Sequence, residues 1–359
     1  MTPFLDTRDP ILWPFTADSI WNMPIGSESV YVNARIGAST LTGMTCDEDI
    51  LILTPNAPLK PIYFNGAGWD ESKTRCGCVD RERLLYPEMV PVPDDFSTDP
   101  GYITGYKRMC PNHSGAILLA DGVTVIQNQP LHVCGKGGVV TSQYIYPSYN
   151  IRTGSGIEGA HGAAGMASLG GSIRVGELLP GSVIRHALKI NLFARKYLYY
   201  NIHSPTPGYR WPAVKTDGYA GDPTSPIAYG GQLPALTVGS LLALKPDFDL
   251  ARLHRDPARI IAQALMDYGG YVVDDVASDS YGLSAEWGPA GRVLDEFQQA
   301  WGFSMDVAPT IFDTGSSPEH VWARDMAEIF THLHVIDNNA PDRIGGGGTP
   351  RQPLAPPFE

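Results

Sequence analysis

Side chains capable of acid–base chemistry gather in two neighbouring stretches in the middle of the chain, residues 154–192 and 201–233. In a polysaccharide lyase, histidine and tyrosine can act as base and acid, while a cationic or amide group neutralises the uronate. The two stretches contain these residue types on segments rich in glycine and turn residues. We therefore predict four catalytic residues: His161, Tyr209, Arg210 and Asp217.

A glycoside hydrolase is the alternative chemistry. It needs two carboxyl groups that face each other across about 5–9 Å. The acidic residues available are Glu158, Asp217, Asp222, Asp274 and Asp275. Their spacing singles out no pair, and each could also cap a turn or end a strand.

Aromatic rings on loops suit a sugar-binding cleft, because rings stack on the apolar faces of sugars while charged groups bind the hydroxyls. The same rings can also serve as ordinary loop anchors. We predict five substrate-binding residues: Glu158, His186, Trp211, Tyr219 and Tyr229.

The glycines of residues 154–171 indicate a backbone that turns sharply or approaches another segment closely. Residues 154–159 match G-x-G-x-x-G, yet no helix-forming sequence follows them, so the match does not indicate a dinucleotide site. Phosphate-loop, zinc-protease and esterase motifs are also missing from the sequence. We expect no cofactor.

Four of the five cysteines could form disulfides or remain as free thiols: Cys76, Cys78, Cys110 and Cys134. Cys76 and Cys78 are separated by one residue, and no second cysteine pair has the spacing of a zinc site. We therefore expect no metal ligands.

The composition indicates a globular, turn-rich chain. Of the 359 residues, 43% are hydrophobic and 18% charged, and there are 39 glycines and 31 prolines. A net charge of −12 argues against nucleic acid as a partner. No apolar run approaches the length of a membrane span, so we expect no membrane insertion, and the N-terminus does not resemble a secretory signal.

Local patterns predict the elements that position these residues. Residues 116–127 predict a β-hairpin with a type I′ turn at Asp121-Gly122. Alternation over residues 183–192 predicts a strand with His186 on its apolar face. Helices are predicted at 256–268, 289–301 and 318–332, and a short strand at 271–273.

These elements predict a mainly β fold with a sandwich-like, jelly-roll-like body, long loops and a few helices in the C-terminal third. We expect a single domain over residues 1–359. Residues 1–36 would form an extended N-terminal arm, and residues 343–359 a Gly/Pro-rich tail.

Several long motifs carry a resemblance: WPFTADSIWNMPIG, GAHGAAGMASLGGSIRVGELLPG, IRHALKINL, GYRWPA, YGG, DYGGYVVDD and GGGGTPRQPLAP. They resemble a family of actinobacterial proteins that is also similar to minor tail proteins of actinobacteriophages. The resemblance spans nearly the whole chain and transfers no catalytic residues.

The resemblance implies a virion protein of the phage tail, or an extracellular protein. The absence of a signal-like N-terminus favours the phage member. Its expected partners are a host-envelope glycan and other tail proteins. The protein would bind the glycan and, in one version of the hypothesis, also cleave it. We also expect a homo-oligomer. Two alternatives stay open: a purely structural tail-tip protein, and a cellular carbohydrate-active enzyme of the lyase or glycoside hydrolase type.

Overall fold

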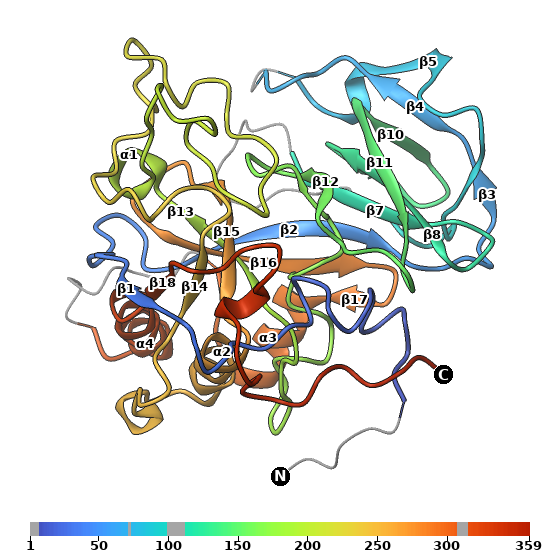
Figure 1. The fold of residues 1–359 in the computed structure, drawn as a ribbon. Coiled ribbons are helices and arrows are strands. Elements are labelled where there is room, and N and C mark those ends of the chain that lie inside the picture. The colour runs from blue at the N-terminus through green and yellow to red at the C-terminus, as the bar shows by residue number, and fades with distance from the viewer. Residues whose placement is uncertain (1–6, 71–72, 99–111, 307–314) are drawn as a thin grey trace.

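A large mixed β-sheet runs through the centre of the molecule (Figure 1). The computed structural model describes residues 7–70, 73–98, 112–306 and 315–359. The strand order of the sheet is β1-β18-β14-β15-β13-β16-β2-β7-β8-β11, and β17 pairs with β16. Its strands are β1 (Tyr31–Asn33), β2 (Thr45–Ile52), β7 (Gly115–Leu118), β8 (Thr124–Gln129), β11 (Tyr144–Asn150), β13 (Leu188–Leu192), β14 (Leu241–Ala243), β15 (Gly270–Asp275), β16 (Tyr281–Gly288), β17 (Gly291–Arg292) and β18 (His334–Ile336).

A second sheet has the order β5-β4-β10-β9 and packs beside one end of the first. Its strands are β4 (Ile62–Asn65), β5 (Val79–Leu84), β9 (His132–Cys134) and β10 (Val139–Ser142). Two short strands, β3 (Leu59–Lys60) and β6 (Val90–Pro91), pair separately, and β12 (Glu158–His161) forms bridges to Met166.

The described helices are few: α1 (Ala194–Tyr197), α2 (Asp256–Asp267), α3 (Val293–Trp301) and α4 (Pro318–Thr331), with 3-10 turns at Cys76–Cys78, Leu250–Arg252 and Ile344–Gly346. The prediction of a mainly β fold with few helices is confirmed. Among the described residues, no helix has the length and apolar character needed to cross a membrane.

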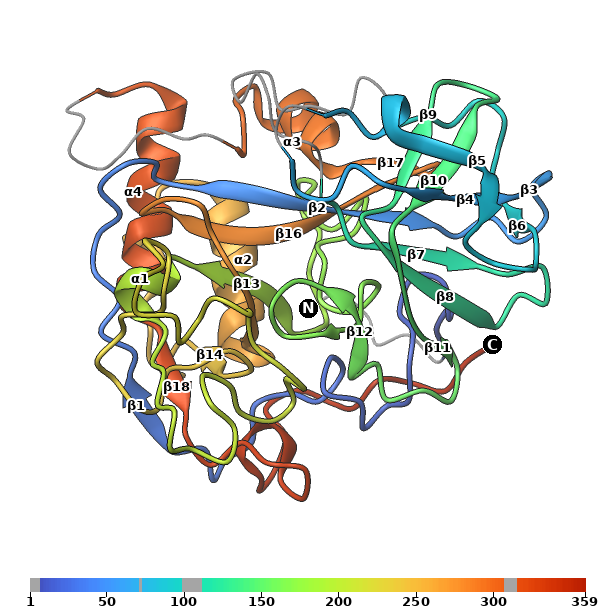
Figure 2. The same ribbon diagram turned by 90° about the horizontal axis from the view of Figure 1, so that it is seen from above.

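Strand β2 carries different side chains on its two faces, because alternate side chains of a strand point to opposite sides. Glu48 points to one face, where both of its oxygens accept hydrogen bonds from Arg292 at 2.6 Å. Ile50 and Ile52, on the same face, belong to the core shared with the second sheet. Asp47 and Asp49 point to the other face, where their carboxylates lie 3.8 and 2.8 Å, respectively, from ring nitrogens of His161 in β12. Figure 2 shows the ribbons of β2 and β12.

The first described residues of the N-terminal arm lie against the C-terminal segment and against the body. Phe15 and Trp21 of the N-terminal arm are buried in the main core. Arg8 donates a hydrogen bond to the carbonyl of Pro356 at 2.7 Å and forms a backbone bridge with Phe358. The tail is therefore a packed closing segment along its described length.

The predicted hairpin is confirmed, since β7 and β8 pair antiparallel. Its turn is wider than the predicted two-residue type I′ turn. The backbone of Leu119 accepts from Gly122 and donates to Thr124 at 2.8 Å. Asp121 caps the loop by accepting from the backbone nitrogens of Val123 and Thr124, which stabilises the longer connection.

Two other predicted elements are shorter than expected. The strand expected over 183–192 begins only at Leu188, because His186 leaves the sheet to pair with Glu177. The helix expected over 289–301 begins at Val293, since the preceding residues form β17. The helix at 318–332 and the strand around 271–273 are confirmed.

Candidate functional site

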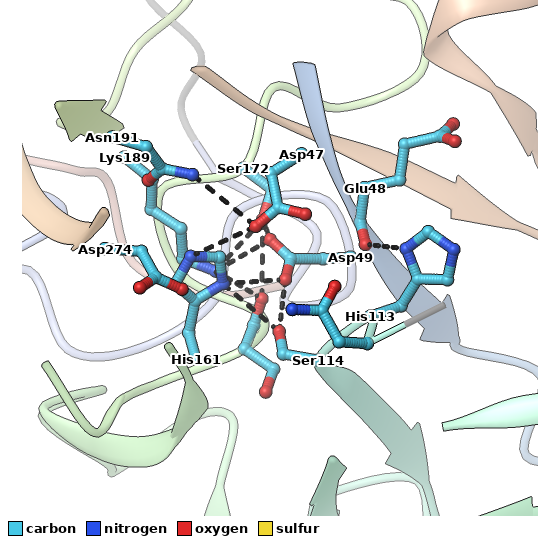
Figure 3. A network of polar contacts seen from close by, with 12 residues as sticks. Asp47, Glu48, Asp49, His113, Ser114, His161, Ser172, Lys189, Asn191 and Asp274 are labelled. Atoms are coloured by element: carbon cyan, nitrogen blue, oxygen red, sulfur yellow. Dashed lines mark hydrogen bonds and ion pairs between the residues drawn. The ribbon is translucent and has the colours of Figure 1, made fainter. Parts of the chain in front are cut away.

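A buried carboxylate, Asp49 of β2, lies at the centre of a polar network inside the protein (Figure 3). Its Oδ2 accepts hydrogen bonds from Lys189 Nζ at 2.8 Å and from Ser172 Oγ at 2.6 Å. Its Oδ1 accepts from His161 Nδ1 at 2.8 Å and from the hydroxyl of Ser114. Burial raises the pKa of Asp49, but Lys189 and His161 outweigh it and hold this pKa well below the usual range, so the carboxylate is ionised.

Lys189 of β13 is fully buried and supplies the opposite charge. Besides Asp49, its Nζ donates to the carbonyl of Ser168 at 2.8 Å and to Ser172 Oγ at 3.3 Å. Burial lowers the pKa of Lys189, and the Asp49 carboxylate only partly offsets this. With every ammonium proton accepted, the pair is a satisfied buried salt bridge that fixes the position of Asp49.

His161 ends β12 and is 1% exposed. Its Nδ1 carries the proton that Asp49 accepts, because an ionised carboxylate has none to donate. Its Nε2 has no hydrogen-bond partner among the described residues and lies 3.8 Å from Asp47 Oδ2. The side chain of Asp47 is 35% exposed, so the network reaches solvent at this end.

Asp274, near the end of β15, reaches the same place. The backbone nitrogen of Ala163 donates to its Oδ1 at 3.1 Å. A Cβ on Gly162, whose φ is +43°, would lie 1.9 Å from Asp274 Oδ2, so glycine is required for this approach.

Asp47, His161 and Asp274 could therefore hold a metal ion, since one ligand atom from each lies within 4.8 Å of the others. A second ligand-type group contains Cys76, His132 and Cys134. Its two cysteines form a disulfide, so their thiolates are not available to a metal. Cys46 and Cys78 are free, and Cys110 lies outside the described residues.

Two tyrosine–aspartate pairs border Asp274. Tyr219 donates to Asp275 Oδ2 at 3.0 Å, and Tyr229 donates to Asp217 Oδ2 at 2.7 Å. The two rings meet edge to face, with their centroids 6.3 Å apart. The bond from Tyr219 attaches the loop of residues 201–233 to the carboxyl end of β15, and the bond from Tyr229 lies within the loop.

Four half-buried carboxyl groups share this region, and their surroundings raise all four pKa values. Burial is the main cause for each, and neighbouring carboxylates add to it for Asp47, Asp274 and Asp275. The pKa of Asp275 rises to about 7, and that of Asp217 also rises. Such crowding of like charges is a feature of functional sites.

Asp217 also lines an open groove of about 530 Å³, together with Tyr200, Tyr209, Lys215 and Asp222. A larger cavity of about 590 Å³ is lined by Trp13, Ile184, Tyr268 and other residues near α2, and its walls are mostly apolar. It contains neither His161 nor any of the four carboxyl groups. The groove is therefore the candidate binding site, because it adjoins the titratable groups.

The structure brings five of the nine predicted site residues to this region. His161 belongs to the buried network, Tyr229 and Asp217 form one hydrogen-bonded pair, and Tyr219 pairs with Asp275. Tyr209 lines the groove.

The other four predicted residues have different surroundings. Arg210 pairs with Asp337 at 3.1 Å, and His186 Nε2 lies 3.0 Å from Glu177. Trp211 packs half-buried against the main core. Glu158 is exposed at the start of β12.

Sequence reasoning missed the residues that hold the network together: Asp47, Asp49, Ser114, Ser172, Lys189 and Asn191. A signal was present in the segments TCDEDILI and LKINL, where acidic residues precede an apolar run and a lysine stands between apolar residues. Charged side chains in such strands indicate a buried polar network, because unpaired charges are too costly to bury.

No protein-family model, curated protein or solved structure matches this chain.

Proposed function

We propose that the protein belongs to a phage tail, binds a host-envelope polysaccharide in the groove and hydrolyses it. The hydrolytic part rests on the position of Asp217. This residue lines the open groove and also lies beside the half-buried carboxyl group of Asp274. The resemblance to minor tail proteins supports the phage part of the proposal.

The groove has the side chains that a sugar polymer needs. Tyr200 and Tyr209 offer aromatic surface, and Lys215 and Asp222 offer charged groups that can bind hydroxyls. Since the groove is open, a long chain can lie along it with both ends in solvent.

The reaction uses two carboxyl groups on either side of the glycosidic bond. Asp275, whose pKa is about 7, donates its proton to the glycosidic oxygen as the bond between that oxygen and the anomeric carbon breaks. Asp217 accepts a proton from the water whose oxygen bonds to the anomeric carbon. Tyr229 and Tyr219 hold the two carboxyl groups by hydrogen bonds of 2.7 and 3.0 Å.

The test incubates the purified protein with envelope polysaccharide from an actinobacterial host and measures new reducing ends and polymer length. We expect depolymerisation, and a loss of about 100-fold or more in Asp217→Asn, the range for removal of a general base. Asp295→Asn is the matched control, because Asp295 is an exposed aspartate that does not line the groove. No reducing ends from any envelope fraction, or full activity of Asp217→Asn, would refute hydrolysis.

The glycine-rich segment bears on the purely structural alternative. Gly156 packs against Phe15 and Trp21, and Gly170 packs against Trp21, so these glycines serve contacts within one chain. They do not require a neighbouring subunit to explain them. A cellular carbohydrate-active enzyme would use the same groups, and a genome neighbourhood of sugar-metabolism genes would favour it.

A further inference from the structure

Three ligand-type atoms meet at the exposed end of the buried network. They are His161 Nε2 and one carboxylate oxygen each from Asp47 and Asp274, all within 4.8 Å of one another (Figure 3). We propose that these side chains bind one divalent transition-metal ion, such as Zn²⁺. This inference goes beyond the proposed hydrolysis, because binding can be measured without any substrate.

The histidine distinguishes this place from an ordinary acidic cluster. His161 is 1% exposed, and its Nε2 finds no hydrogen-bond partner among the described residues. A buried polar atom without a partner costs about 1–3 kcal/mol. A metal ion bound to the Nε2 lone pair removes that cost.

The ligand atoms lie within 4.8 Å of one another, so small side-chain movements would close them around an ion. With bonds of about 2.0–2.2 Å, the ligands of a tetrahedral zinc lie about 3.4 Å apart. His161 Nε2 and Asp47 Oδ2 are 3.8 Å apart, so a movement of a few tenths of an ångström brings them into range. Three protein ligands leave a position for water, on the side where Asp47 is exposed.

The surroundings hold the ligands in place. Asp49 accepts the Nδ1 proton of His161, which leaves Nε2 free to coordinate, the arrangement common around metal-bound histidines. Lys189 and Ser172 fix Asp49 in turn. The backbone nitrogen of Ala163 fixes the carboxylate of Asp274.

The local charge also favours a cation. Asp47 and Asp274 lie near Asp217 and Asp275, whereas the buried cation Lys189 is already paired with Asp49. An imidazole ligand beside carboxylates favours zinc or manganese over magnesium and calcium, which prefer oxygen ligands alone.

The test titrates the full-length chain, freed of metal with a chelator, with ZnCl₂, MnCl₂, MgCl₂ and CaCl₂ in a calorimeter. No thiol reductant is present, so that the Cys76–Cys134 disulfide stays closed. We expect one Zn²⁺ site, at least about tenfold tighter than Mg²⁺ or Ca²⁺. Asp47→Asn and Asp274→Asn should each weaken Zn²⁺ binding by more than about tenfold.

His254→Gln is the matched control, because His254 also pairs with a carboxylate, Asp325, but is largely exposed and has no second acidic partner of this kind. It should bind Zn²⁺ as the wild type does. Circular dichroism checks that each variant is folded. If Asp274→Asn does not fold, Asp47→Asn decides the test by itself, because Asp47 lies at the exposed end of the network and its replacement disturbs the core less.

Two results would overturn the inference: no Zn²⁺ binding by the wild type, or wild-type binding by the folded Asp47→Asn variant. The first would mean that Asp47, His161 and Asp274 hold their places without a metal ion. The absorption bands of bound Co²⁺ give a second readout and should disappear in Asp47→Asn. Metal binding without polysaccharide cleavage would support the metal site and count against the hydrolysis alone.

Discussion

Replacing Lys189 with methionine should destabilise the fold by about 3–5 kcal/mol, the cost of removing one partner of a buried ion pair. Methionine fills the space of the lysine stem but has no ammonium group. The substitution removes a charge-assisted hydrogen bond of 2.8 Å to Asp49, worth about 1.5–3 kcal/mol. It also leaves the carbonyl of Ser168 without its 2.8 Å donor, at a cost of about 1–3 kcal/mol.

Urea unfolding at neutral pH measures this loss as the change in the free energy of unfolding. The double variant Asp49→Asn/Lys189→Met provides the internal control, because it removes both charges. We expect it to be more stable than Lys189→Met alone, since replacing a whole buried pair is far less costly than breaking it. A loss below about 1 kcal/mol in Lys189→Met, or a double variant no more stable than the single one, would refute a buried charged pair.

Three further predictions test the rest of the structure. Burial lowers the pKa of His186, but Glu177 outweighs it and raises this pKa above the ordinary value. The stabilisation from this pair should therefore be present below about pH 6.5 and be lost as the pH rises through the folded-state pKa of His186. Urea unfolding from pH 5 to 9 measures this as a fall in the free energy of unfolding, and the fall should be smaller in Glu177→Gln. The Cys76–Cys134 disulfide spans 58 residues, so replacing both cysteines with serine should cost about 4 kcal/mol of unfolding free energy, and an unchanged urea midpoint would contradict this. Gly162→Ala should displace Asp274 of β15 and lower polysaccharide cleavage by about 100-fold in the reducing-end assay. Wild-type activity of this variant would contradict the prediction and show that the loop can adjust.

Local sequence patterns predict the elements that depend mainly on contacts within a short stretch of the chain. The β7–β8 hairpin follows from alternation around one turn, and helix α4 follows from its apolar stripe. The polar network cannot be predicted in this way, because its partners are distant in sequence. Asp49 lies 112 residues from His161 and 140 from Lys189. The strand order of the large sheet places Lys189 of β13 near Asp49 of β2, since both strands pair with β16, whereas His161 comes from β12, outside that sheet.

The position of His186 shows why periodicity alone misleads near such a site. Alternation over 183–192 assigns it to an apolar sheet face, yet the chain enters the sheet only at Leu188. A single ion pair with Glu177, at 3.0 Å, outweighs the strand pattern there. Element boundaries depend on contacts that a short window of sequence does not contain.

The glycines of the central stretch have two separate roles, and the difference bears on function. Gly156 and Gly170 admit the rings of the N-terminal arm, so they serve the packing of the core. Gly162 instead admits the carboxylate of Asp274 beside His161, a contact that brings like charges and an unpartnered nitrogen together. Packing alone gives no reason to bring these groups together, because the arrangement is costly without a ligand. The cation that we propose would supply that reason, and it would enter beside Asp47, whose side chain is exposed to solvent.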